Sequence, residues 1–148
     1  MIRNSPERRR NHALRVATAA GALQALATTA ALACSCAAPT FEGLLQAAPA
    51  IFSGVATGSV PATQGESVTT FTVVEGFKGV RAGQSVRVRH RSGSSASCGV
   101  RFALGETHTL STYREEIGTS LFANLCSVMI FRTRSGEQII QRLRQVGR

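Results

Sequence analysis

The four cysteines constrain this chain more than any other feature of its sequence. They stand at positions 34, 36, 98 and 126, and no cysteine precedes them. An even number of cysteines is typical of a small domain stabilised by disulfide bonds. Of the three pairings, the one that joins Cys34 to Cys36 closes a very small, strained ring. The other two pairings both tie the Cys34–Cys36 segment to distant parts of the chain, and the residues alone leave these two open.

The residues before Cys34 have the parts of a secretory signal peptide. A basic start with five arginines precedes an uncharged, largely apolar run at 16–33, which ends in the small-residue cleavage pattern Ala-Leu-Ala. We therefore expect residues 1–33 to be removed on export, which leaves 34–148 as one secreted or periplasmic domain. A retained membrane anchor and a lipid-modified Cys34 are the alternatives, although Ala31 stands where bacterial lipoproteins usually carry leucine.

The net charge of the whole chain, +9, overstates the charge of the predicted domain. Five of the 17 basic residues and one of the eight acidic residues lie in the leader, which leaves a net charge of +5. With one Tyr and no Trp to stack on bases, an exported chain of this kind is not expected to bind nucleic acid. The sequence has no phosphate-binding loop, Gly-x-Ser-x-Gly elbow or His-Glu-x-x-His motif, so we expect neither an enzyme nor a cofactor.

Short strands and two small helices are expected after residue 34. The stretches rich in β-branched and aromatic residues, bounded by turn residues, are 50–58, 68–77, 84–91, 107–113 and 121–126. Thr40 is placed to cap a short helix that ends at Pro49, and Ser135 with Gln138 forms a capping box for a C-terminal helix. This pattern predicts a mainly β fold with a closed or partly closed antiparallel barrel.

One of the expected strands carries a stripe of positive charge. Arg87, Arg89 and Arg91 alternate with two valines, so they are expected on the face opposite the core. Together with His90 they form a basic stripe. The stripe is either a solvated strand face or a binding site for anionic polysaccharide or an envelope surface.

Several stretches of the chain resemble one known family. The opening at 34–39, Cys-Ser-Cys-Ala-Ala-Pro, resembles the mature start of the tissue inhibitors of metalloproteinases, which belong to the netrin-like group. Residues 49–55 resemble the first strand of that family, and 71–79 resemble its strand ending in an aromatic-Lys-Gly turn. Cys98 followed by glycine resembles its central Cys-Gly, and Cys126 stands where the family has the partner of the second N-terminal cysteine. The resemblance spans most of the predicted domain and is to a single-domain member of bacterial type.

The resemblance implies a fold and a disulfide pairing. The fold is a five-stranded OB-fold-like barrel with a short N-terminal and a C-terminal α-helix. The implied disulfides are Cys34–Cys98 and Cys36–Cys126.

The resemblance also implies a mode of action. In the family, the first mature residue presents its free α-amine and carbonyl to the catalytic zinc of a metalloendopeptidase. By this resemblance Cys34 would chelate that zinc, and the chain would be a monomeric inhibitor with no metal of its own. The wedge that contacts the protease would consist of Ser35, Cys36, Ala37, Pro39, Ser97 and Cys98.

The chain also departs from the family pattern. It lacks a further N-domain disulfide, the second six-cysteine domain of the animal inhibitors and the His-Pro-Gln run after the opening. Two other hypotheses therefore stand beside inhibition: a netrin-like binding or adhesion module without inhibitory activity, and an envelope lipoprotein. A free amine at Cys34 is required by the first hypothesis, optional for the second and excluded by the third.

Overall fold

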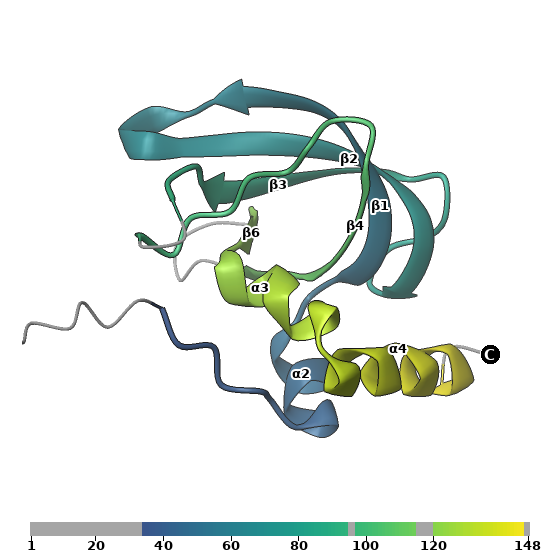
Figure 1. Cartoon of the computed structure of the whole chain (residues 1–148). Coiled ribbons are helices and arrows are strands. Elements are labelled where there is room, and N and C mark those ends of the chain that lie inside the picture. Colours follow the sequence, from purple (N-terminus) through teal and green to yellow (C-terminus); the bar gives the residue numbers. More distant parts are fainter. Residues whose placement is uncertain (1–33, 95–96, 115–119, 147–148) are drawn as a thin grey trace, which may run out of the picture. The chain divides into compact units, whose positions relative to one another are not determined.

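The computed structural model describes residues 34–94, 97–114 and 120–146, so the predicted leader lies outside the described residues. The described chain is mainly β, as predicted, and its strands form one sheet (Figure 1). The strands are β1 (Ile51–Pro61), β2 (Glu66–Lys78), β3 (Ser85–Arg91), β4 (Thr107–Ser111), β5 (Tyr113–Arg114) and β6 (Leu121–Ala123). The helices are α2 (Phe41–Ala47), α3 (Leu125–Met129) and α4 (Arg134–Val146), with short 3-10 turns η2 (Thr63–Gly65) and η4 (Ile130–Arg132).

The position of Thr112 requires the sheet to curl. The strand order is β4-β1-β2-β3-β6-β5, in which only β3 and β6 pair in parallel. Strands β4 and β5 occupy opposite ends of this order, yet Thr112 alone separates them in the chain. Because consecutive Cα atoms lie about 3.8 Å apart, the two edges must come together at Thr112. Its backbone N–H donates to the Ala50 carbonyl at 2.9 Å, and its hydroxyl donates to the same oxygen at 3.0 Å. The sheet is therefore a curled half-barrel.

The strand count differs from the prediction. The predicted strand 107–113 is interrupted at Thr112, and the predicted strand 121–126 ends at Ala123, so the sheet has six strands among the described residues. The interruption arises from the bonds between Thr112 and Ala50, which turn the chain from one sheet edge to the other. Thr and Tyr themselves favour strands, so the local sequence carries no sign of this break.

Strand β1 separates two hydrophobic clusters, because consecutive side chains of a strand point to opposite faces. Phe52 and Ile51 are both fully buried, but Phe52 lies in the inner cluster and Ile51 in the outer one. The inner cluster fills the curled sheet with Phe52, Phe71, Val73, Val86, Val88, Val100, Phe102 and Leu110, among others. The outer cluster joins the helices to β1 through Phe41, Leu44, Ile130, Phe131, Ile139 and Leu143.

The short helix α2 begins as predicted. The Thr40 hydroxyl accepts a hydrogen bond from the Gly43 N–H at 3.0 Å, which satisfies one of the free donors of the first turn. At the other end, Lys78 donates to the Leu45 carbonyl and, at 2.6 Å, to the Ala48 carbonyl. The last carbonyls of a helix lack partners within it, so Lys78 fixes the end of α2 against β2.

The C-terminal helix α4 is present, but its predicted cap is wrong. Ser135 lies inside the helix, and the Thr133 hydroxyl accepts the hydrogen bond from the Gly136 N–H at 3.1 Å. Thr133 has the extended backbone of a capping residue because the preceding turn η4 ends there. Figure 1 shows α4 beside α2, where the Arg142 guanidinium lies 4.0 Å from the Phe41 ring centre. No helix within the described ranges is long and apolar enough to cross a membrane.

Candidate functional site

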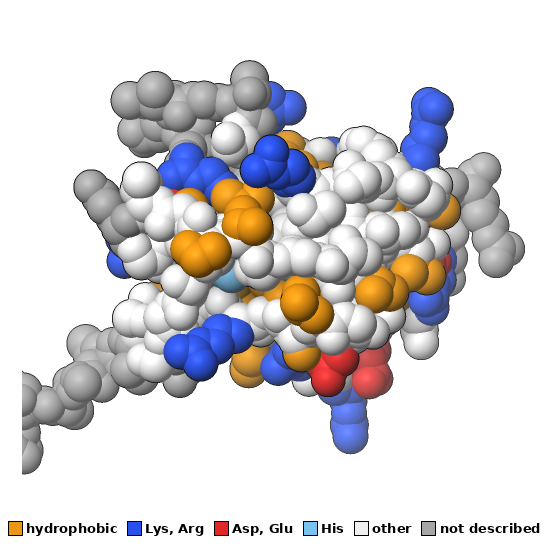
Figure 2. Space-filling view, turned by 90° about the horizontal axis from the view of Figure 1, so that it is seen from above, with side chains coloured by type: hydrophobic (Ala, Val, Ile, Leu, Met, Phe, Trp, Pro, Cys, Tyr) orange, Lys and Arg blue, Asp and Glu red, His pale blue; other side chains and the backbone are white. Residues whose placement is uncertain are grey.

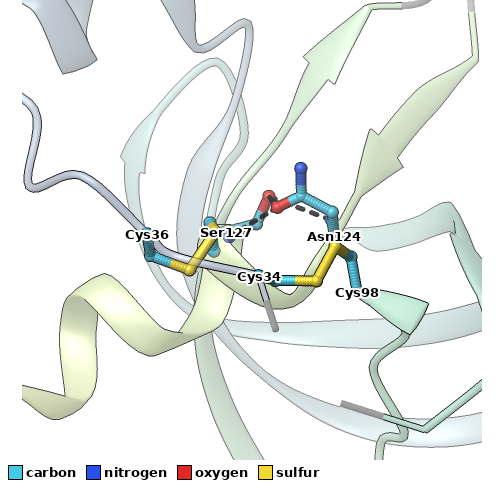
Figure 3. Close-up of a disulfide and its surroundings, with 6 residues drawn as sticks. Cys34, Cys36, Cys98, Asn124 and Ser127 are labelled. Atoms are coloured by element: carbon cyan, nitrogen blue, oxygen red, sulfur yellow. Dashed lines mark hydrogen bonds between the residues drawn. A yellow bond between two sulfur atoms is a disulfide. The ribbon is translucent and has the colours of Figure 1, made fainter. Parts of the chain in front are cut away.

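The segment 34–39 is held to the rest of the described chain by covalent bonds. Disulfides join Cys34 to Cys98 and Cys36 to Cys126 (Figure 3), the two pairs that the family resemblance implies. The segment has no helical or strand structure, and apart from the half-buried Cys34 its residues are exposed. Within the described ranges, no hydrogen bond involves residues 34–39. Its backbone donors and acceptors are therefore available to a partner.

The anchor points of the two disulfides are themselves connected. Cys98 has a positive φ of 57°, a left-handed conformation that is uncommon for a residue with a side chain. Its carbonyl accepts a hydrogen bond from the N–H of Leu125, the first residue of α3, at 3.2 Å. Cys126 follows directly in α3, so the loop at Cys98 and the start of α3 present both half-cystines to the segment together.

A capping box fixes the start of α3, where the sequence pattern predicts a strand. The Asn124 side chain accepts from the Ser127 N–H at 3.0 Å, and the Ser127 hydroxyl accepts from the Asn124 N–H at 3.1 Å (Figure 3). This reciprocal pair sets the direction in which Cys126 leaves the helix. An Asn followed three residues later by Ser is the sequence signal for this box, although Asn124 also falls within the predicted strand 121–126.

The predicted wedge residues occupy two neighbouring exposed segments. Ser35, Ala37 and Pro39 lie along the N-terminal segment, and Ser97 lies beside Cys98 on the loop to which this segment is bridged. The Ser97 hydroxyl donates to the Ser94 carbonyl at 2.8 Å, so this loop is closed on itself. The structure thus brings the two parts of the wedge together through Cys34–Cys98, with the side chains of the segment exposed.

An apolar cavity of about 310 Å³ lies between the segment and the helices. On one side it is lined by Cys34, Cys36, Ala37, Ala38 and Pro39. On the other side Leu125, Met129 and Ile139 are among the lining residues, from α3 and α4. The segment is therefore held above the helices at its two cysteines rather than packed tightly on them.

The predicted basic stripe is only partly correct. Arg87, Arg89 and Arg91 lie on the outer face of β3, but Arg89 forms an ion pair with Glu66. His90 does not belong to the stripe, because it shares the inner face with the buried valines and is 2% exposed. In the face seen in Figure 2, basic side chains stand at several separate places rather than in one band.

His90 is part of a buried network on the inner face of β3. Its Nδ1 donates to the Val100 carbonyl at 3.0 Å, and its Nε2 lies within hydrogen-bond distance of the Thr69 hydroxyl, at 2.8 Å. The Phe102 ring packs against it with centroids 4.9 Å apart. Burial lowers the pKa of His90, although its backbone hydrogen bonds at Arg91 and Val100 oppose the shift. A neutral His90 therefore connects β3 to the residues that follow Cys98.

The second strand histidine also has a structural place. His108, on β4, is buried, with Nε2 3.2 Å from the Ala103 carbonyl and its ring 5.2 Å from that of Phe102. Among the described residues, no group of three or more His, Cys, Asp and Glu side chains is placed to hold a metal ion.

Comparison with known proteins adds no family to this description. No family model matches the chain, and no curated protein matches it.

Proposed function

We propose that the exported chain inhibits zinc metalloendopeptidases through a free N-terminus at Cys34. One observation carries the proposal: residues 35–39 are exposed and free of hydrogen bonds, while disulfides fix the backbone at both cysteines. A terminus of this kind combines an accessible backbone with restricted motion. The ordering cost of binding falls when the bound conformation already exists in the free protein.

The chemistry of a terminal Cys34 suits zinc. An α-amine has a pKa near 8, so a substantial neutral fraction with a free lone pair exists close to neutral pH. The amine nitrogen and the carbonyl oxygen of one residue close a five-membered ring on a metal ion. A catalytic zinc keeps one position for water or substrate, and the Cys34 terminus would replace that water. The disulfide to Cys98 leaves both backbone groups free, because it engages only the side chain.

The neighbouring residues would then contact the protease. Ser35, which lies between the two bridged cysteines and is exposed, would enter the specificity pocket beside the zinc. Ala37 and Pro39 on one side, and Ser97 with Cys98 on the other, would flank it. We interpret the curled sheet behind this edge as an OB-type barrel in which the two-residue strand β5 is an addition.

The composition of the chain permits a sharp test of the amine. Lys78 is the only lysine, so a Lys78→Arg variant leaves the α-amine as the one amine that acetylation can modify. Lys78 binds carbonyls at the end of α2, and arginine retains a charged donor there. The acetylated and unmodified forms of this variant would be compared as inhibitors of a panel of zinc metalloendopeptidases.

We expect the unmodified variant to inhibit at least one enzyme of the panel. Acetylation should weaken that inhibition by about 100-fold or more, equivalent to roughly 2.7 kcal/mol, because the acetylated nitrogen has no lone pair for zinc. Circular dichroism of the two forms provides the control for folding. Equal inhibition by the acetylated form would contradict the chelation mechanism, and a lack of inhibition across the panel would contradict the proposed function.

A further inference from the structure

A second cavity lies on the other side of α3 from the apolar one. Its volume is about 410 Å³, which is in the usual range for small-ligand sites. Leu125 and Met129 line both cavities, so α3 forms the ridge between them. The far wall is formed by Gly93, Gly99 and the residues that follow Gly99. We call this cavity the α3 cleft.

The wall of the α3 cleft depends on a close contact between two glycines. A Cβ added to Gly99 would lie 2.5 Å from both the backbone N and the backbone O of Gly93. These are backbone atoms that cannot move away cheaply, so only glycine permits the two arms of the loop to approach this closely. The Gly99 N–H also donates to the Ser94 carbonyl at 3.1 Å.

Hydrogen bonds hold the rest of this wall in place. Val100 donates through its N–H to the Arg91 carbonyl at 2.9 Å and accepts from His90 through its carbonyl at 3.0 Å. The Cys98 carbonyl accepts from Leu125 on the opposite wall at 3.2 Å. The α3 cleft is therefore formed before any ligand arrives, which reduces the ordering cost of binding.

The α3 cleft carries positive charge that no described residue neutralises. Arg101 and Arg132 line it from separate parts of the chain, and none of its described lining residues is Asp or Glu. In the described part of the chain, neither guanidinium forms an ion pair or a hydrogen bond. Three other arginines do have carboxylate partners: Arg89 with Glu66, Arg142 with Glu42 and Arg144 with Glu75. Guanidinium groups bind carboxylate and phosphate oxygens in pairs, so the cleft favours an anion.

Apolar side chains line the α3 cleft together with these arginines. Leu125, Val128 and Met129 contribute to it, and Met129 is 38% exposed, one of the few large hydrophobic side chains on the surface. Val128 is already buried, but an inorganic anion alone would leave Leu125 and Met129 partly in contact with water. An apolar chain would cover them, and the flexible Met129 side chain can adapt to its shape.

We propose that the α3 cleft binds a single-chain anionic amphiphile. Its carboxylate or phosphate head lies against Arg101 and Arg132, and its apolar chain lies on Leu125, Val128 and Met129. A cavity of this size holds one chain and not the surface of a bilayer, so the ligand is a free molecule. This inference does not depend on the proposed inhibitory function, because it uses neither Cys34 nor the segment that follows it.

The test uses the exported protein and sodium decanoate below its micelle concentration, with binding measured by isothermal titration calorimetry. We expect saturable binding of decanoate with one site per chain, and binding of acetate that is about ten-fold weaker or more, since acetate lacks the chain. The cationic analogue decyltrimethylammonium should not bind.

Charge variants locate the site. Arg101→Gln and Arg132→Gln should each weaken decanoate binding by about five-fold or more, which is within the range of a charge-assisted hydrogen bond. The matched control is Arg81→Gln, which removes the same charge from an exposed turn before β3 and should leave the affinity unchanged. Met129→Gln should also weaken decanoate binding while leaving acetate binding unchanged.

Three results would overturn the proposal. Equal weakening by Arg81→Gln would show that overall charge, and not the α3 cleft, attracts decanoate. Binding of the cationic analogue as tight as that of decanoate would show general apolar adsorption. Binding to anionic phospholipid vesicles without binding of monomeric decanoate would show a membrane-surface site instead. Circular dichroism and proton NMR of each variant verify that the fold is retained.

Discussion

Replacing Cys36 and Cys126 by serine removes one disulfide and leaves Cys34 bridged to Cys98. The removed bridge spans 90 residues, and alone it would restrict the unfolded chain by about 4.6 kcal/mol in the chain-entropy model. The retained Cys34–Cys98 bridge lowers this value. In the unfolded chain it still connects Cys36 to Cys126 by a short path, which runs back from Cys36 to Cys34, across the bridge to Cys98 and along the chain to Cys126.

This path amounts to an effective loop of about 30 residues, for which the same model gives about 3.6 kcal/mol. Removing Cys34–Cys98 instead leaves a path of the same length, although that bridge spans only 64 residues. We therefore expect the two single removals to cost nearly equal amounts, about 3–4 kcal/mol each, and the removal of both to cost about 8 kcal/mol. Cys36 is exposed and Cys126 half-buried, so serine adds little cavity cost.

The assay is urea unfolding followed by circular dichroism, with the free energy of unfolding obtained by linear extrapolation. Each removed bridge should also raise the m-value, because the unfolded chain becomes more expanded. A single removal that costs less than about 1.5 kcal/mol would refute the loop argument. So would a large inequality between the two removals, since it would show that packing at one bridge, and not the shared loop, determines the cost.

Three further predictions concern the core and the helices. The folded pKa of His90 lies below its unfolded value near 6.5, so the unfolded chain gains this proton before the folded chain does as the pH falls. Stability that is present above about pH 6.5 should therefore decrease on acidification by up to about 1.4 kcal/mol per pH unit, and His90→Gln should flatten this part of a urea-unfolding pH profile. Phe71→Ala should cost about 3–5 kcal/mol in the same assay, because Phe71 is fully buried among other rings; a cost under about 1 kcal/mol would contradict that packing. Gly136→Ala should lower the thermal midpoint, since the new Cβ would lie 2.1 Å from the Ile130 carbonyl oxygen, while the matched Gly58→Ala, with nothing within 4 Å, should not.

Some features of the fold followed from local patterns in the sequence. The Thr40 cap and the alternation of Val86 and Val88 with arginines could be predicted from the sequence, because both depend only on neighbouring residues. The same alternation places His90 on the face of the valines, so the period of two already contradicts its place in the basic stripe. The disulfide pairs came from the family resemblance, since the residues alone left two pairings.

Other features depend on contacts between residues far apart in the chain. The break at Thr112 results from its hydrogen bonds to Ala50, 62 residues earlier, which no local pattern shows. The α3 cleft likewise joins Arg101 and Arg132 across the fold. The Ser135 prediction failed for a different reason, because Thr133 is an equally suitable cap and the turn η4 determines which of the two begins the helix.

The most direct test of the central claim is the intact mass and disulfide map of the protein recovered after export. We expect a chain that begins at an unmodified Cys34, lacks four thiol hydrogens and is bridged Cys34–Cys98 and Cys36–Cys126. A free α-amine would then stand at a doubly anchored terminus, as zinc chelation requires. A chain that retains leader residues, or that carries an acyl group on Cys34, would contradict zinc chelation by the Cys34 amine.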